Sequence, residues 1–112
     1  GDALRCATFF RDHFGFPAIG EWSSDWAELK AGACSLAFHQ AYGPHGPISG
    51  PTGSPMNPHK IVITVADVAA AHARLKAAGL TVEAIESFPD FGNLSYFHGT
   101  DPEGHVYQIC NR

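Results

Sequence analysis

Polar side chains recur at alternate positions of strand-like segments whose other positions are apolar. In residues 34–40, Ser35 and His39 alternate with Leu36 and Phe38. Because successive side chains of a strand point to opposite faces, such polar groups should share the face away from a packed helix. This pattern selects one set of candidate binding residues: Ser35, His39, Lys60, Thr64 and Gln108.

Aromatic residues accompany these polar positions in the predicted strands. Trp26 begins one strand and Tyr96 lies within another, so both are added to the candidate site. An apolar, aromatic-lined surface with a few polar groups is typical of a small-molecule site. Lys60 would favour a carboxylate or phenolate group, because its ammonium would otherwise face an apolar cavity unpaired. His39 could bind a ligand, transfer protons near neutral pH, or lie hydrated at the rim.

The spacing reveals no pair of nucleophile and base, so no catalytic residue can be named.

Two segments with helical periodicity must pack against these strands. The first spans residues 2–14 and ends at Gly15, and the second spans residues 67–78 and ends at Gly79. Asp2 and Asp67 suit the N-cap position, where a carboxylate accepts the free amide hydrogens of the first turn. Each glycine suits the position after the helix, because it adopts the left-handed conformation cheaply.

The remaining ordered segments read as β-strands. After the first helix we expect strands at residues 18–22, 26–31 and 34–40. A strand at residues 60–65 precedes the second helix, and strands at residues 81–87, 94–98 and 105–110 follow it. The turn Asp101-Pro102-Glu103-Gly104 introduces the last strand, because Pro at the second turn position and Gly at the fourth favour a tight reversal.

The chain therefore divides into two similar halves within one domain of 112 residues. Module one covers residues 1–40 and module two residues 59–112, and residues 41–58 form a linker rich in Pro and Gly. Module two has the order β-α-β-β-β. Module one has the same order without its opening strand, so we expect an unpaired sheet edge and a homodimer.

Composition excludes several classes of protein. The formal net charge of −4 gives no basic surface for nucleic acid, and the apolar runs are too short to span a membrane. No secretory leader is visible. The cysteines Cys6, Cys34 and Cys110 are widely spaced without a C-x-x-C pair, which favours reduced thiols in a cytoplasmic protein. We expect each to be a small buried apolar residue.

Three segments, in this order, resemble the vicinal oxygen chelate superfamily, which includes glyoxalases, extradiol dioxygenases and bleomycin-resistance proteins. The segments are residues 9–16, residues 61–68 with Leu75 and Gly79, and the turn at residues 101–104 with its following strand. The resemblance implies an α+β fold, in which two β-α-β-β-β modules form curved mixed sheets around a cavity with helices outside. It also implies a small-molecule ligand and a homodimer.

The resemblance further implies a metal site with one ligand on the first and last strand of each module. Ala37, Lys60 and Gln108 occupy three of these positions, and the fourth has no residue here. Ala has no donor atom, a Lys ammonium has no lone pair, and Gln is a weak neutral ligand. We therefore expect no metal. His59 would replace Lys60 after a shift of one residue, but that shift would reverse the face of the strand.

Two functions remain open at this point. The first is a metal-free protein that binds and sequesters a small apolar or aromatic compound, as bleomycin-resistance proteins do. The second is a metal-dependent lyase or dioxygenase with an unusual ligand set such as His39, His59 and Gln108, holding Zn, Ni, Fe or Mn. The sequence favours the first, because Ala37 and Lys60 cannot ligate a metal.

Overall fold

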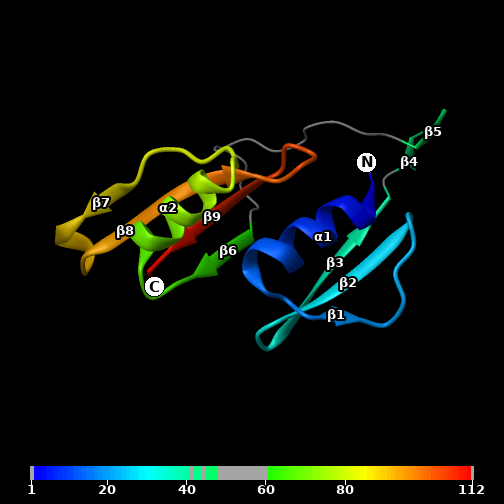
Figure 1. The fold of residues 1–112 in the computed structure, drawn as a ribbon, viewed down its shortest axis with the longest axis horizontal. Helices are drawn as coiled ribbons and strands as arrows, with labels where there is room; N and C mark the ends of the chain where they lie inside the picture. Colours follow the sequence, from blue (N-terminus) through cyan, green and yellow to red (C-terminus); the bar gives the residue numbers. More distant parts are fainter. Residues whose placement is uncertain (1, 41, 44, 48–60, 112) are drawn as a thin grey trace. The chain divides into compact units, whose positions relative to one another are not determined.

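The computed structural model describes residues 2–40, 42–43, 45–47 and 61–111. The chain divides into two compact units, Gly1–Thr52 and Gly53–Arg112. In each unit one α-helix packs on an open β-sheet, which confirms the predicted α+β class (Figure 1). None of the described helices is long and apolar enough to cross a membrane.

The first unit consists of one helix and a three-stranded antiparallel sheet. Helix α1 (Ala3–Phe14) precedes strands β1 (Ala18–Ile19), β2 (Trp26–Ala31) and β3 (Cys34–His39), which pair in the order β1-β2-β3. A small hairpin follows, made by β4 (Tyr42–Gly43) and β5 (Gly46–Pro47).

The predicted caps of α1 are present. The Asp2 carboxylate accepts a hydrogen bond from the Leu4 N–H at 2.9 Å, and Gly15 ends the helix with φ of 71°.

The buried side of this sheet follows the predicted alternation. Phe10 is 1% exposed and packs on Phe38 with ring centroids 5.5 Å apart. Ala27 and Leu29 of β2 are fully buried against the helix side as well. Ala37, next to Phe38 in β3, is exposed on the opposite face.

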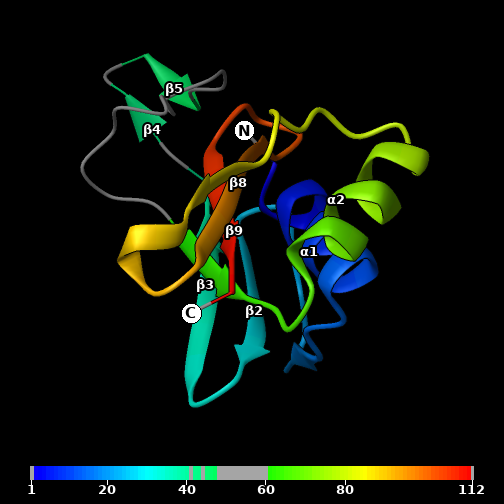
Figure 2. The same cartoon turned by 90° about the vertical axis from the view of Figure 1, so that its left-hand side faces the viewer.

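The second unit has a four-stranded mixed sheet. Strand β6 (Ile61–Thr64) leads into helix α2 (Val68–Ala77), followed by β7 (Glu86–Phe88), the 3-10 turn η1 (Pro89–Phe91), β8 (Leu94–Thr100) and β9 (Val106–Cys110). The order is β6-β9-β8-β7, with β6 parallel to β9 and the other neighbours antiparallel. Figure 2 shows α2 on one side of this sheet.

Helix α2 covers the predicted packing face. Tyr107 and Ile109 are fully buried, Phe97 is 1% exposed, and Leu75 supplies the facing side chain from the helix. Gly99 lies so close to the Tyr107 ring that a Cβ atom at this position would clash with it. Burial raises the pKa of Tyr107 to about 12, and the charge of Asp101 adds to the rise. This face of the sheet is therefore the dry one.

Several sequence expectations need correction. The strand expected at residues 81–87 is wrong: the chain makes a single bridge at Val82 and becomes a strand only at Glu86. The strand expected at residues 18–22 is shortened to Ala18–Ile19.

Cys34 is exposed, unlike Cys6 and Cys110, because it follows the Gly32–Ala33 turn at the tip of the hairpin. None of these three cysteines, all of them among the described residues, forms a disulfide.

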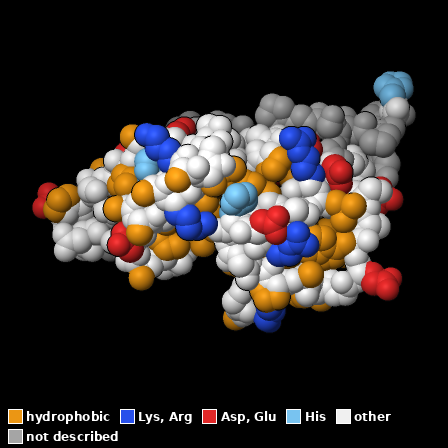
Figure 3. Space-filling model, viewed as in Figure 1, with side chains coloured by type: hydrophobic (Ala, Val, Ile, Leu, Met, Phe, Trp, Pro, Cys, Tyr) orange, Lys and Arg blue, Asp and Glu red, His pale blue; other side chains and the backbone are white. Residues whose placement is uncertain are grey.

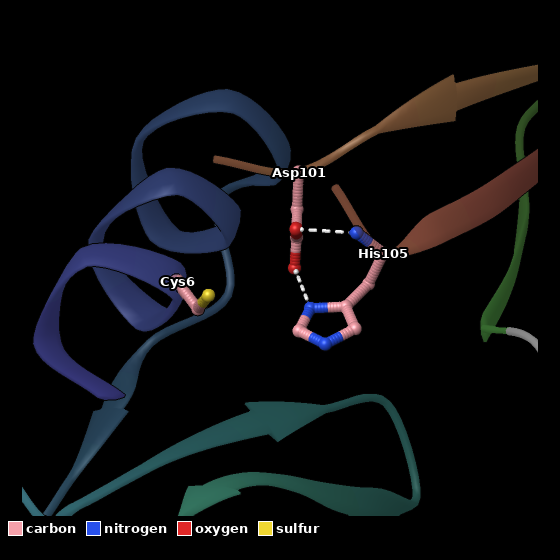
Figure 4. Close-up of side chains that lie close together, drawn as sticks. All are labelled: Cys6, Asp101 and His105. Carbon is pink, nitrogen blue, oxygen red and sulfur yellow. Dashed lines mark hydrogen bonds and ion pairs between the residues drawn. The ribbon is translucent and has the colours of Figure 1, made fainter. Parts of the chain in front are cut away.

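The turn before β9 is organised by one buried carboxylate. The Asp101 side chain is 2% exposed, and its Oδ1 accepts the backbone N–H groups of Glu103 and His105, both at 2.9 Å. Its Oδ2 lies 3.1 Å from the His105 Nδ1 (Figure 4). These bonds close the turn and set where β9 begins, so they also fix the position of Gln108.

We expect Asp101→Ala to lower the free energy of unfolding by about 1–3 kcal/mol, because two backbone N–H groups lose their acceptor. Urea denaturation measures this change. His105→Ala is the matched control, because it removes only the side-chain contact of a half-exposed ring and keeps the backbone bond. An equal loss in both variants would contradict this account of the turn.

Candidate functional site

Each sheet has one face covered by its helix and one face turned away from it, which we call the open face. On the open face of the second unit, Gln108 lies between Val62 of β6 and His98 of β8. Thr64 pairs with Cys110, which in turn pairs with Tyr96. The structure thus brings together three predicted residues, Thr64, Tyr96 and Gln108, on one face.

The predicted residues of the first unit share its open face. Trp26 and His39 are directly opposite each other, with ring centroids 6.0 Å apart at an angle of 70°. Ser35 is exposed opposite Lys30. Trp26 is 45% exposed, so its ring is available to a ligand. Lys60 and His59 lie outside the described residues.

His98, which is not among the predicted site residues, also belongs to the open face of the second unit, where strand alternation places it on the same face as Tyr96. It is the cross-strand neighbour of Gln108, and its ring centroid is 5.4 Å from that of Tyr96. Its Nδ1 lies 3.6 Å from a carboxylate oxygen of Glu83. Gln108, His98 and Tyr96 therefore form a continuous row of an amide, an imidazole and a phenol.

An extra residue in the segment 82–86, which lies beside β8, places two further carboxylates on the open face. Val82 pairs with Gly99, and Glu86 pairs with Tyr96. Between these two pairs, the three residues 83–85 therefore lie opposite only two residues of β8, 97 and 98. Such a bulge reverses the alternation of side chains beyond it. On a regular strand Glu83 and Glu86 would point to opposite faces; here both contact open-face residues.

Glu86 holds the Tyr96 hydroxyl beside an exposed ring. The Tyr96 O–H donates to the Glu86 carboxylate at 2.7 Å. The Phe88 ring is parallel to that of Tyr96 within 8°, with centroids 5.9 Å apart, and Phe88 is 38% exposed. The hydrogen bond with Glu86 raises the pKa of Tyr96, with partial burial and the charges of Glu86 and Glu83 adding to the rise.

The metal positions implied by the family do not form a ligand set. Ala37 has no donor atom and pairs with Glu28 across the strands. Gln108 offers only a neutral amide oxygen, and its neighbour Val62 offers none. The described residues at these positions therefore do not fit the usual metal.

A hollow of about 370 Å³ lies near the start of α2, and its lining includes Asp67, Ser87 and Ser95. Ser87 and Ser95 pair across β7 and β8 on the helix side of the sheet, with their hydroxyl oxygens 3.0 Å apart. The hollow is therefore separate from the predicted site on the open face.

A family model for the glyoxalase/bleomycin resistance protein/dioxygenase superfamily matches residues 1–109. The chain belongs to this superfamily, in agreement with the resemblance of its sequence. None of the curated proteins matches the chain.

Solved structures share the fold at low sequence identity. A lactoylglutathione lyase from Agrobacterium tumefaciens has a TM-score of 0.67 and 20% identity, with 98% of this chain and 86% of that chain covered. TnmS3, an antibiotic binding protein from Streptomyces sp. CB03234, has a TM-score of 0.66 and 22% identity, with coverages of 97% and 85%. A bleomycin resistance determinant encoded on transposon Tn5 has a TM-score of 0.60 and 17% identity, with coverages of 96% and 86%.

We expect Glu86→Gln to lower the pKa of Tyr96 toward its ordinary value of about 10, because a neutral amide stabilises the protonated phenol less than a carboxylate does. Carbon-13 NMR of tyrosine Cζ during a pH titration measures this change. Tyr107 is the internal control, since burial is the main cause of its raised pKa. An unchanged Tyr96 titration would show that the Glu86 contact is not formed in solution.

Proposed function

We propose that the protein binds and sequesters a small apolar or aromatic compound without a metal, in the manner of the glyoxalase/bleomycin-resistance type. The observation that carries this proposal is the open face of the second unit. There Phe88 and Val62 are 38% and 52% exposed beside the polar row of Gln108, His98 and Tyr96. Exposed apolar groups around a few fixed polar groups are what a planar organic ligand requires.

The ligand set of the family gives a second argument for binding. The chemistry of a chelated substrate requires several donor atoms around one ion. At one ligand position of the family this chain has Ala37, which has no donor atom. At another it has Gln108, a neutral amide in place of a charged ligand. Of the similar structures, one is called an antibiotic binding protein and another a bleomycin resistance determinant, and these names support a binding function.

We further propose that the protein acts as a homodimer in the cytoplasm. Among the described strands, β3 forms an edge of the first sheet at the place where β9 pairs with the opening strand β6 in the second sheet, so the missing opening strand of the first unit leaves the β3 edge unpaired. An unpaired edge is a surface on which a second chain can pair. Sedimentation velocity at high micromolar concentration measures the assembly, and a monomer there would contradict the dimer.

Gln108→Leu should weaken binding of small planar fragments by about threefold to tenfold and leave stability nearly unchanged, because the side chain lines the open face and not the core. A fragment screen by ¹H–¹⁵N NMR provides the affinities. Ile109→Ala is the contrasting control, since Ile109 is fully buried and its loss should destabilise the fold. Fragment-induced shifts confined to α1 and α2 would refute the site.

We expect no stoichiometric Zn, Ni, Fe or Mn in protein purified without a His tag, because the described ligand positions cannot complete a metal site. Elemental analysis of all four metals measures the content. One tightly held ion per chain that is lost on substitution of His59 or Gln108 would instead support the metal-dependent lyase or dioxygenase.

A further inference from the structure

The outer half of the open face in the second unit combines aromatic rings with carboxylates. Phe88 and Tyr96 present parallel rings, and the Glu86 carboxylate is held at the edge of this pair by the Tyr96 hydroxyl. Glu83 adds a second carboxylate with 58% of its side chain exposed. We define Glu83, Glu86, Phe88 and Tyr96 as the aromatic–acid edge.

The electrostatic balance of this edge favours a positively charged partner. Within the described part of the second unit, the Lys and Arg side chains are Arg74 and Lys76, and both belong to the last turn of α2. Figure 3 looks onto this helix and shows basic side chains over it. They therefore lie on the covered side of the sheet, whereas the two carboxylates lie on the open face.

Ring faces and carboxylates attract the same kind of group. The face of an aromatic ring carries partial negative charge and attracts a cation within about 6 Å of its centroid. A carboxylate accepts hydrogen bonds from an ammonium or amidinium group and gains strength from the opposite charge. Because Tyr96 fixes Glu86 beside the rings, one ligand can contact both at once.

We propose that this aromatic–acid edge binds a planar aromatic compound that carries a positively charged nitrogen. The ring lies against Phe88 and Tyr96, and the nitrogen donates to Glu86, with Glu83 as the next acceptor. This assignment rests on the proposed binding function and narrows its ligand class. The sequence predicts an anionic ligand, because Lys60 would favour a carboxylate or phenolate. The ligand proposed here is cationic, so the two expectations differ in the sign of the ligand's charge.

Three matched fragments test the sign of the charge on the full-length chain: benzylamine, benzyl alcohol and benzoate. We expect benzylamine to bind most tightly and to shift the amide signals of β7 and β8 in ¹H–¹⁵N NMR. Benzyl alcohol should bind more weakly at the same place, and benzoate should bind least. The advantage of benzylamine should shrink at high salt, because exposed charges are screened.

Glu86→Gln should weaken benzylamine binding about threefold to fivefold and leave benzyl alcohol unchanged, as expected for the loss of one exposed charge partner. Glu21→Gln is the matched control, because it removes the same charge from an exposed position in the first unit. Phe88→Leu should weaken both fragments, since it removes ring contact and not charge.

The outcomes separate this inference from the proposed function. Benzoate binding as tightly as benzylamine, or equal effects of Glu86→Gln and Glu21→Gln, would overturn the cationic ligand while leaving a small-molecule site intact. Absence of any fragment shift on either open face would overturn both. Benzylamine selectivity that depends on Glu86 would support both.

Discussion

The pairing of β8 with β9 determines what the second unit buries and what it presents. In this ladder Phe97 pairs with Ile109, and His98 pairs with Gln108. The first pair faces α2 and forms the dry core, and the second faces the opposite way. Because a strand has a period of two, a shift of one residue would expose the core pair and bury the polar pair. The core therefore enforces the geometry of the site.

The two units repeat one arrangement with different chemistry. The register of β2 on β3 pairs Trp26 with His39 and Glu28 with Ala37, as β8 on β9 pairs Tyr96 with Cys110 and His98 with Gln108. Trp26 and Tyr96 thus hold equivalent positions on their open faces, and so do Ala37 and Gln108. An aromatic residue is present at the first of these two positions in both units. At the second position neither unit has a metal-binding carboxylate.

Much of the fold could be predicted because its determinants are local. Asp2 and Asp67 cap the helices as expected, since a carboxylate at an N-cap needs only its own next turn. The faces of Phe38 and Tyr107 followed from alternation within regular strands. The roles of Glu83 and Glu86 could not be predicted, because the extra residue between Val82 and Glu86 is set by pairing with β8 and has no signature in the sequence.

The bulge also explains why the outer edge of the site is acidic. The His72 ring on α2 contacts the Glu83 carbonyl oxygen at 2.8 Å, while the Glu83 N–H donates to the His98 carbonyl at 2.8 Å. The backbone of Glu83 is thus held from the helix side and from β8. Its side chain is left on the open face, and after the bulge Glu86 is placed there as well. An irregularity that serves the packing of the sheet has the consequence of gathering two carboxylates beside Phe88 and Tyr96, where a regular strand would have shown one.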